Sequence, residues 1–245
     1  MEKAWYKEWF ASEDYLDVYR HRNSADTDSL IELILSNTQP DKKSKILDAA
    51  CGAGRHSIKF AEKGFNVTGF DLSTTLLNIA ISHANKRNLK IDFINSDLRS
   101  FYSNKKFDLV LSLFTSFGYF NSDTENFEFV KNAHKMLIDD GYYVLDYFNK
   151  KFLENNLIQD TKRIVGKKEI IENRKIIDGR IVKRIKIISE ENNHDYVESV
   201  KLYSYDELVK NFMSIGYKVI KAFGDYLGSN FENENSERCI IIFQK

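Results

Sequence analysis

The chain has 245 residues, and its lysines plus arginines equal its aspartates plus glutamates at 36 each, so its formal net charge is zero. This length allows one substantial hydrophobic core, as a single α/β domain or a domain with a small inserted lobe. Zero net charge gives no long-range attraction to nucleic acid or to an acidic membrane, and it favours a small, roughly neutral partner.

Cysteine content and hydropathy indicate where in the cell the protein is expected. The two cysteines, Cys51 and Cys239, argue against a disulfide framework and against a cysteine-based zinc site. No uncharged apolar stretch approaches the roughly 18 residues that a membrane-spanning helix needs. We therefore expect a cytoplasmic protein that makes no membrane contact.

Two helices are predicted before the first strand. Residues 2–20 carry aromatic pairs at i,i+4 spacing, and residues 27–36 form a compact amphipathic pattern that ends before Pro40. We interpret the aromatic stripe as core packing, with the alternative that some of its rings roof a ligand. Residues 1–40 are predicted to form an N-terminal helical cap.

Apolar and polar periods then alternate in the way that is typical of parallel α/β units. Strands are predicted at 45–49, 65–71, 90–94, 107–113 and 141–147, with helices at 54–63, 74–87 and 124–137 between them. Gly64 is placed as a helix stop and Asp123 as a helix cap. A repeat of this kind builds a right-handed parallel sheet.

The pattern changes after residue 150. Asp178-Gly179 separates two β-rich runs, which predicts a hairpin within an antiparallel lobe spanning 160–203. On its second arm the isoleucines 181, 185 and 187 fall on one face, so the other face meets water. Residues 160–190 hold ten basic and five acidic side chains. We interpret this excess as a solvated sheet face, the alternative being a surface that attracts an anionic substrate.

The α/β pattern returns at the end of the chain. A helix is predicted at 205–215 with Ser204 as its cap, followed by strands near 217–224 and 238–244. Residues 41–159 and 204–245 are therefore predicted to form one α/β domain, and the lobe interrupts it to cover the substrate side.

A glycine-rich turn after the first strand, "LDAACGAGRHS", indicates a nucleotide site. Gly52 and Gly54 allow the backbone to approach a ligand closely. The three-glycine dinucleotide spacing would need a third glycine where Ser57 stands, and no lysine closes the turn as in an NTP-binding loop. Asp48 adds a carboxylate before the turn, which suits a ligand with a positive end better than a pyrophosphate.

Two further acids follow the next strands. Asp71 ends the second predicted strand, where an acid can hold both hydroxyls of a ribose, an arrangement that also fits NAD. Asp97 lies just past the third strand, where it could accept a hydrogen bond from an adenine amino group while Leu98 packs on the ring. Together the three carboxylates favour a cationic nucleoside without phosphates.

This combination resembles the class I S-adenosylmethionine-dependent methyltransferases over about residues 45–245. The matching segments are "LDAACGAG" (47–54), "FDLS" (70–73), "SDLRSF" (96–101), "FDLVLSLF" (107–114) and "LIDDGYYVLDYF" (137–148). The resemblance implies a Rossmann-like α/β fold with a seven-stranded sheet whose last strand is antiparallel. It also implies S-adenosyl-L-methionine as the cofactor and S-adenosyl-L-homocysteine as the product.

The resemblance further implies which residues bind the cofactor. The glycine motif lies near the methionine end, the acid of the second motif holds the ribose, the third motif frames the adenine, and the end of the fourth strand lines the pocket. The residues so implied are Asp48, Ala50, Gly52, Gly54, Asp71, Leu72, Asp97, Leu98, Leu113 and Phe114.

The acceptor is expected to be a small organic molecule methylated on nitrogen or oxygen. The Asn/Asp-Pro-Pro-Tyr/Phe motif of many nucleic acid base methyltransferases is absent, because Pro40 is the only proline, so no nucleic acid partner is expected. A protein acceptor is harder to exclude. No metal is expected, since no cluster has ligand spacing. The oligomeric state, monomer or dimer, stays open.

For catalysis, His21 is the candidate proton acceptor, with Tyr15 and Tyr19 as the side chains that position the substrate. The alternative is that His21 is a helix-end residue. His56 is interpreted as a packing residue or as a hydrogen-bond partner of the glycine motif. Two rival functions remain at this stage: an NAD(P)-linked oxidoreductase, and a non-catalytic cofactor-binding subunit that serves a partner chain.

Overall fold

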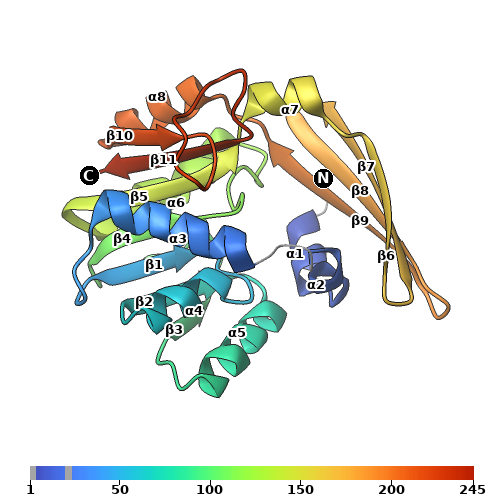
Figure 1. Ribbon diagram of the computed structural model, residues 1–245, viewed down its shortest axis with the longest axis horizontal. Coiled ribbons are helices and arrows are strands. Elements are labelled where there is room, and N and C mark those ends of the chain that lie inside the picture. Colours follow the sequence, from blue (N-terminus) through green and yellow to red (C-terminus); the bar gives the residue numbers. More distant parts are fainter. Residues whose placement is uncertain (1–3, 20–23) are drawn as a thin grey trace.

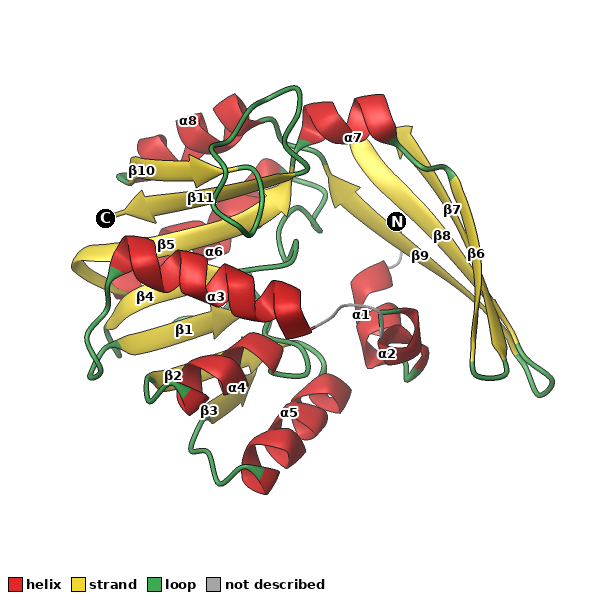
Figure 2. Cartoon of the chain, viewed as in Figure 1, coloured by secondary structure: helices red, strands yellow, loops and turns green. Residues whose placement is uncertain are grey.

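The computed structural model describes residues 4–19 and 24–245, which form two separate β-sheets with helices around the larger one (Figures 1 and 2). Across the larger sheet the strands are β10 (Lys218–Phe223), β11 (Arg238–Gln244), β5 (Leu137–Phe148), β4 (Phe107–Ser112), β1 (Lys45–Ala49), β2 (Asn66–Asp71) and β3 (Asp92–Asn95). In this sheet β11 runs antiparallel to the other six strands. The predicted seven-stranded sheet with an antiparallel last strand is confirmed.

Helices bury both faces of this sheet. On one face α3 (Ser24–Thr38) and α4 (Arg55–Glu62) pack on the strands, with α5 (Thr74–Lys86) beside α4. On the other face lie α6 (Asp123–Met136) and α8 (Tyr205–Ile215). Neighbouring residues of a strand point to opposite faces of the sheet. Ile46 packs on the α3 and α4 side, Leu47 packs on the α6 and α8 side, and both are fully buried. This two-sided burial explains why the strands read as continuous apolar runs.

The second sheet is the predicted antiparallel lobe. Its strands are β6 (Asp160–Val165), β7 (Lys168–Ile177), β8 (Arg180–Ile188) and β9 (Asn193–Lys201), in that order. Asp178 (φ 50°) and Gly179 (φ 69°) form the tight β7–β8 turn in the left-handed conformation that such a hairpin requires. The three isoleucines predicted to share one face of β8 are all buried.

The N-terminal segment contains two short helices instead of the single helix predicted over 2–20. They are α1 (Trp5–Ala11) and α2 (Asp14–Val18), and the Ser12 hydroxyl between them accepts a hydrogen bond from the Asp14 amide. Such a local side-chain bond competes with helix continuation. Trp9 and Val18 pack against Ile170, Ile185 and Ile187, so both helices rest on the inner face of the lobe (Figure 1).

Other boundaries also differ from the prediction: the helix predicted at 27–36 is longer at both ends and spans Ser24–Thr38. β3 begins at Asp92 instead of residue 90, and β5 begins at Leu137, directly after α6. Ser122, not Asp123, caps α6, because its side chain accepts from the Glu125 amide. Helix α7 (Lys150–Asn156) was not predicted; it buries no residue, so it carries no periodic apolar signal. Ser204 does cap α8, in a complete capping box.

Several organisational predictions stay predictions. The division into a cap, an α/β domain and a lobe is one, although α3 packs on the sheet while α1 and α2 pack on the lobe. Within residues 4–19 and 24–245, no helix is both long and apolar enough to cross a bilayer. Those residues also contain no cluster of potential metal ligands.

Candidate active site

A cavity of about 300 Å³ lies where the carboxyl ends of β1, β2, β3 and β4 meet. Nine of the ten residues predicted to bind the cofactor line it: Asp48, Ala50, Gly52, Asp71, Leu72, Asp97, Leu98, Leu113 and Phe114. Tyr15 and Tyr19 line it as well. Segments far apart in the sequence thus meet at one sheet edge, the usual ligand position in open α/β sheets.

Gly54 is the predicted cofactor residue that does not line the cavity. It precedes α4 with φ 77°, and a Cβ there would lie 2.8 Å from the Cβ of Ala80 in α5. Its glycine is therefore required for the backbone conformation and for the packing of α4 against α5. Ala50 and Gly52 also have positive φ values, 51° and 55°, so the turn wraps tightly around the end of β1.

Asp71 organises the turn from the end of β2. Its carboxylate accepts hydrogen bonds from the amides of Gly52, at 2.8 Å, and Ser73, at 2.7 Å. Burial raises the pKa of Asp71, and these backbone bonds oppose the shift. A carboxylate can accept about four hydrogen bonds, so capacity remains for ribose hydroxyls.

Asp48 is buried beneath the turn, where the Ser57 hydroxyl donates a 2.5 Å hydrogen bond to its carboxylate. Burial raises the pKa of Asp48 to about 6, and the nearby negative charge of Asp71 adds to the rise. Ser57 stands where a dinucleotide motif would have its third glycine. In this turn Ser57 instead donates the hydrogen bond that fixes the Asp48 carboxylate.

Asp97 is held by Arg99, a partner that was not identified from the sequence. The guanidinium donates to both carboxylate oxygens, at 3.0 and 2.7 Å, and the Arg99 amide donates at 2.8 Å. Burial opposes the charge of Asp97, but the bonds from Arg99 prevail and lower its pKa. Three of about four acceptor positions are occupied, which leaves room for one hydrogen bond from an adenine amino group.

Helix α1 forms part of the wall of this cavity. Tyr6 and Phe10 line it, and the Ser73 hydroxyl donates to the Phe10 carbonyl at 2.6 Å. The Tyr6 ring lies edge-on to Phe120, with their centroids 5.6 Å apart. The N-terminal aromatic stripe thus packs together and also lines the cavity, with four of its rings: Tyr6, Phe10, Tyr15 and Tyr19.

A second cavity of about 510 Å³ adjoins the first and extends toward the lobe. Five aromatic residues line both cavities: Phe10, Tyr15, Tyr19, Phe114 and Tyr119. On the lobe side the second cavity is lined by Arg174, Lys183 and Glu198, among others, and on the core side by Tyr226 and Arg238. Both volumes are typical of small-molecule sites.

The turn after β4, between the two cavities, has unusual backbone geometry. Phe114 and Thr115 have φ values of 56° and 67°, which are uncommon for non-glycine residues. Asp146, fully buried in β5, accepts hydrogen bonds from the Phe114 amide (3.1 Å), from Tyr226 (3.1 Å) and from Arg238 (2.6 Å). This carboxylate thereby positions side chains of both cavities. It was missed because it lies inside an apolar strand.

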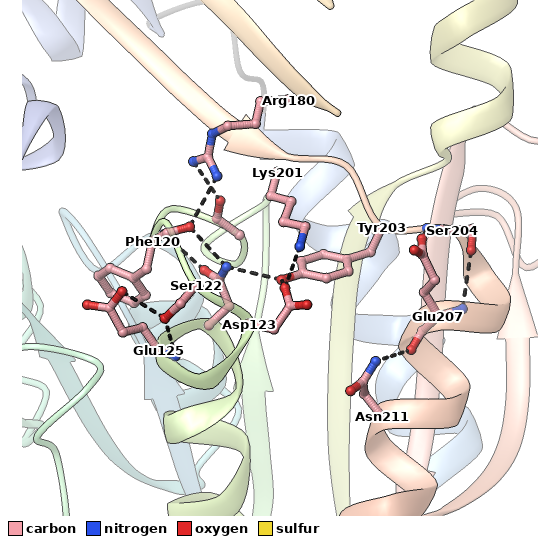
Figure 3. A network of polar contacts seen from close by, with 12 residues as sticks. Phe120, Ser122, Asp123, Glu125, Arg180, Lys201, Tyr203, Ser204, Glu207 and Asn211 are labelled. Atoms are coloured by element: carbon pink, nitrogen blue, oxygen red, sulfur yellow. Dashed lines mark hydrogen bonds and ion pairs between the residues drawn. The ribbon is translucent and has the colours of Figure 1, made fainter. Parts of the chain in front are cut away.

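Arg180 joins the base of the lobe to the same loop (Figure 3). Its guanidinium donates to the carbonyls of Gly118, Tyr119 and Phe120 at 3.1–3.2 Å, and to the Ser199 hydroxyl at 2.7 Å. Beside it, Asp123 in α6 accepts hydrogen bonds from Lys201 and Tyr203, as Figure 3 also shows. These contacts fix the lobe relative to the loop that separates the cavities.

The inner face of the lobe holds Tyr19 in place. Its hydroxyl donates to Glu198 and accepts from Lys183, while Glu198 also pairs with Lys183 at 2.6 Å and accepts from the Trp9 indole at 2.6 Å. The basic excess of the lobe is divided between its faces. Arg184 and Lys186 are exposed, while Lys183 is buried among carboxylates.

Two histidines were assigned roles from the sequence, His21 and His56. His21 lies outside the described residues, so its role as a base stays a prediction. His56 lines the first cavity, 7% exposed, with its ring centroid 5.6 Å from that of Phe114. Its packing on Phe114 agrees with the interpretation as a packing residue.

Comparison with known proteins identifies the family of residues 46–141. Residues 46–141, which carry the glycine turn, Asp71 and Asp97, match the family profile described as "Methyltransferase domain". This segment is a class I S-adenosylmethionine-dependent methyltransferase domain. Its family uses S-adenosylmethionine as the methyl donor.

Relatives of the methyltransferase domain act on different acceptors, according to their names. The ubiquinone biosynthesis O-methyltransferase of Rickettsia canadensis (strain McKiel) is 30% identical over 43% of this chain and 44% of its own. The dTDP-3-amino-3,4,6-trideoxy-alpha-D-glucopyranose N,N-dimethyltransferase of Streptomyces venezuelae is 29% identical over 63% of this chain and 66% of its own. The chain spans less than half the length of the first curated relatives that it matches.

A solved structure resembles nearly the whole chain, beyond the methyltransferase domain itself. An S-adenosylmethionine-dependent methyltransferase from Clostridium acetobutylicum ATCC 824 superposes with a TM-score of 0.79, covering 89% of this chain and 90% of that one. Sequence identity is 18%, so this likeness establishes the fold alone.

Proposed function

We propose that the chain transfers a methyl group from S-adenosyl-L-methionine to a small organic acceptor. One observation carries the proposal: the cavity with Asp48, Asp71 and Asp97 shares an aromatic wall with a second, larger cavity under the lobe. Cofactor and acceptor would then occupy adjoining spaces, as in-line displacement requires. The names of the two relatives above, one acting on oxygen and one on nitrogen, support small acceptors of either kind.

The first cavity suits the sulfonium cofactor in its chemistry. It offers three carboxylates and turn backbone, whereas Ser57 replaces the third glycine of a dinucleotide motif and no lysine closes the turn as in an NTP-binding loop. Bound S-adenosylmethionine supplies an activated methyl group with a good leaving group. The protein residues then need chiefly to orient the acceptor and to exclude water.

Tyr15 and Tyr19 are proposed to position the acceptor, because both side chains border the two cavities. Lys183 and Glu198 fix the Tyr19 hydroxyl, which pre-organises it for that role. His21 is retained as the proposed proton acceptor. The rate of methyl transfer by a His21→Ala variant should fall below the wild-type rate above about pH 6.5. In that range an ordinary imidazole is neutral and can accept a proton. Wild-type rates in that variant would remove the assignment.

Calorimetric titration with S-adenosylhomocysteine tests the donor site. Asp71→Asn keeps the shape of the side chain but removes its charge, and we expect roughly 30- to 100-fold weaker binding from the loss of about 2–3 kcal/mol of charge-assisted hydrogen bonding. Asp92→Asn is the matched control, since Asp92 is exposed in the neighbouring strand and, among the described residues, forms its ion pair with Lys105.

The result separates the proposal from its rivals. Binding of NADH instead of S-adenosylhomocysteine by folded wild-type protein would support the oxidoreductase. Tight S-adenosylhomocysteine binding without turnover on any acceptor panel would support the non-catalytic subunit. Turnover on protein or RNA preparations but not on small molecules would contradict the acceptor class.

A further inference from the structure

We infer that the second cavity binds its acceptor as an amine that carries no phosphate or other strongly anionic group. The inference rests on the proposed function, because that function identifies the second cavity as the acceptor site. It narrows the acceptor from any small nucleophile to a cationic nitrogen compound.

The cations that line the second cavity are each paired with a carboxylate of the protein. Among the described residues these are Arg174, Lys183 and Arg238. Arg174 lies 2.8 Å from Glu172, Lys183 lies 2.6 Å from Glu198, and Arg238 lies 2.6 Å from Asp146. These carboxylates are themselves shielded from water, with side-chain exposures of 4%, 15% and 0%.

A phosphate or carboxylate ligand would have to compete with these internal partners. Separating a shielded ion pair leaves an unpaired carboxylate behind, which is strongly unfavourable. The positive side chains of the lobe therefore do not form an anion site. This argues against the sequence-based alternative in which the basic excess of the lobe attracts an anionic substrate.

Carboxylates on the core side are not balanced in this way. Asp225 and Glu237 line the second cavity from the connection between β10 and β11. Asp225 accepts from the backbone amides of Leu227, at 2.9 Å, and Ser229, at 3.1 Å. No lysine or arginine in the described part of the chain forms an ion pair with either carboxylate. Counted over the described residues, the lining holds four carboxylates and three cations, so it carries an excess of negative charge; the carboxylates are Asp26, Glu198, Asp225 and Glu237.

The aromatic wall adds a surface that a cation can use. Trp5 and Tyr119 both line the second cavity, with their rings edge-on to each other and the centroids 5.3 Å apart. Ring faces attract ammonium groups, more strongly where water is excluded. An amine approaching the first cavity along this wall meets negative charge behind it and aromatic faces beside it.

The reaction balances for an amine acceptor. The bound ammonium first releases a proton to solvent at the rim, where Glu237 is exposed. The freed nitrogen lone pair forms the new N–C bond, the S–C bond breaks, and sulfur keeps its electron pair. The neutral thioether product has no charge to retain it against the carboxylates.

The test compares three ligands of one shape that differ in charge. Equilibrium dialysis of 2-phenylethylamine, 2-phenylethanol and phenylacetate would use protein saturated with S-adenosylhomocysteine. We expect the amine to bind at least about ten-fold tighter than phenylacetate, with the alcohol between them, because two partly exposed carboxylates repel the anion and attract the cation.

Two variants test whether a carboxylate of the second cavity causes the preference for the amine over phenylacetate. Glu237→Gln should reduce the amine-to-phenylacetate ratio by about three-fold, the effect of one partly solvated ion pair. Glu234→Gln is the matched control, because Glu234 is exposed in the same connection and does not line the cavity. That variant should keep the wild-type ratio.

Equal affinities, tighter phenylacetate binding, or no detectable amine binding to the loaded protein would each overturn the inference. So would an equal loss in both variants. Failure of the proposed function is distinguishable, because it appears earlier, as failure of the wild-type protein to bind S-adenosylhomocysteine at all.

Discussion

The two cavities share an aromatic wall, yet they are built in different ways. The polar groups of the first come from strand ends and turns, and their partners lie nearby in the sequence, as Ser57 does for Asp48 and Arg99 for Asp97. The polar groups of the second come from distant segments: Trp9 with Glu198, and Asp146 with Arg238. The cofactor side is thus a local design, and the acceptor side depends on how the lobe and the cap assemble.

The comparison predicts that the largest stability effects come from the long-range pairs. Arg238→Met should lower the free energy of unfolding by about 3–5 kcal/mol, because it leaves Asp146 buried and unpaired. Asp146 is fully buried and the Arg238 side chain is only 16% exposed. Urea unfolding at equilibrium measures the change.

A double variant separates the unpaired charge from lost packing. Asp146→Leu combined with Arg238→Met removes both charges and should recover most of the loss, since apolar replacement of a buried pair is often neutral. If the double variant were as unstable as Arg238→Met alone, the charge pair would not explain the loss. The geometry of the Phe114 turn would then be the cause.

On the lobe side a smaller effect is expected. Lys183→Met should cost about 2 kcal/mol, because Glu198 keeps hydrogen bonds from Trp9 and Tyr19. The loss should be local, so amide hydrogen exchange should accelerate in α1 and α2 before it does in α4. Lys186→Met, at an exposed position of the same strand, is the control. Uniform acceleration across the whole chain would contradict this division.

The contrast between the cavities also explains what the sequence could predict. Gly52, Asp71 and Asp97 were recognisable because each directly follows an apolar strand, and strand ends converge at one sheet edge. The Asp178-Gly179 turn fixed the lobe hairpin by local backbone chemistry alone. Periodicity and turn chemistry are local signals, and local features were predicted well.

What escaped prediction was non-local or lacked a periodic signal. Asp146 sits within an apolar strand, and nothing nearby in the sequence points to Arg238 as its partner. Lys183 reads as one more base on a basic strand, although its neighbours bury it. No residue of helix α7 is fully buried, so apolar periodicity could not reveal it. Such features follow from tertiary packing, which one sequence does not display.

Substitution of Arg180 tests the contacts between the lobe and the loop that separates the two cavities. Arg180→Lys should lower the free energy of unfolding by about 1–2 kcal/mol, because an ammonium group cannot reproduce hydrogen bonds to three carbonyls and a hydroxyl at once. Arg184→Lys, on the exposed face of the same strand, should change stability by less than about 0.5 kcal/mol. Equal effects of the two substitutions in thermal unfolding would show that the Arg180 contacts do not anchor the lobe.

A further prediction concerns the charge of Asp48. Burial raises its folded-state pKa from 3.8 to about 6, with the charge of Asp71 adding to the rise and Arg55 opposing it. The folded protein therefore binds more protons than the unfolded chain between these two values. The contribution of Asp48 to stability falls as the pH rises through that window, and it stays lower above about pH 6.

Ligand binding should reveal the same ionisation with the opposite sign. S-adenosylmethionine carries a sulfonium charge and S-adenosylhomocysteine does not, while the two are otherwise nearly identical. As Asp48 ionises between about pH 5 and about pH 7, the affinity ratio of the cationic to the neutral ligand should rise about three-fold. Asp48→Asn can still accept the Ser57 hydrogen bond and should flatten the ratio. A wild-type ratio that stays flat or falls would mean that the Asp48 charge does not act on the sulfonium, and that this carboxylate only supports the turn.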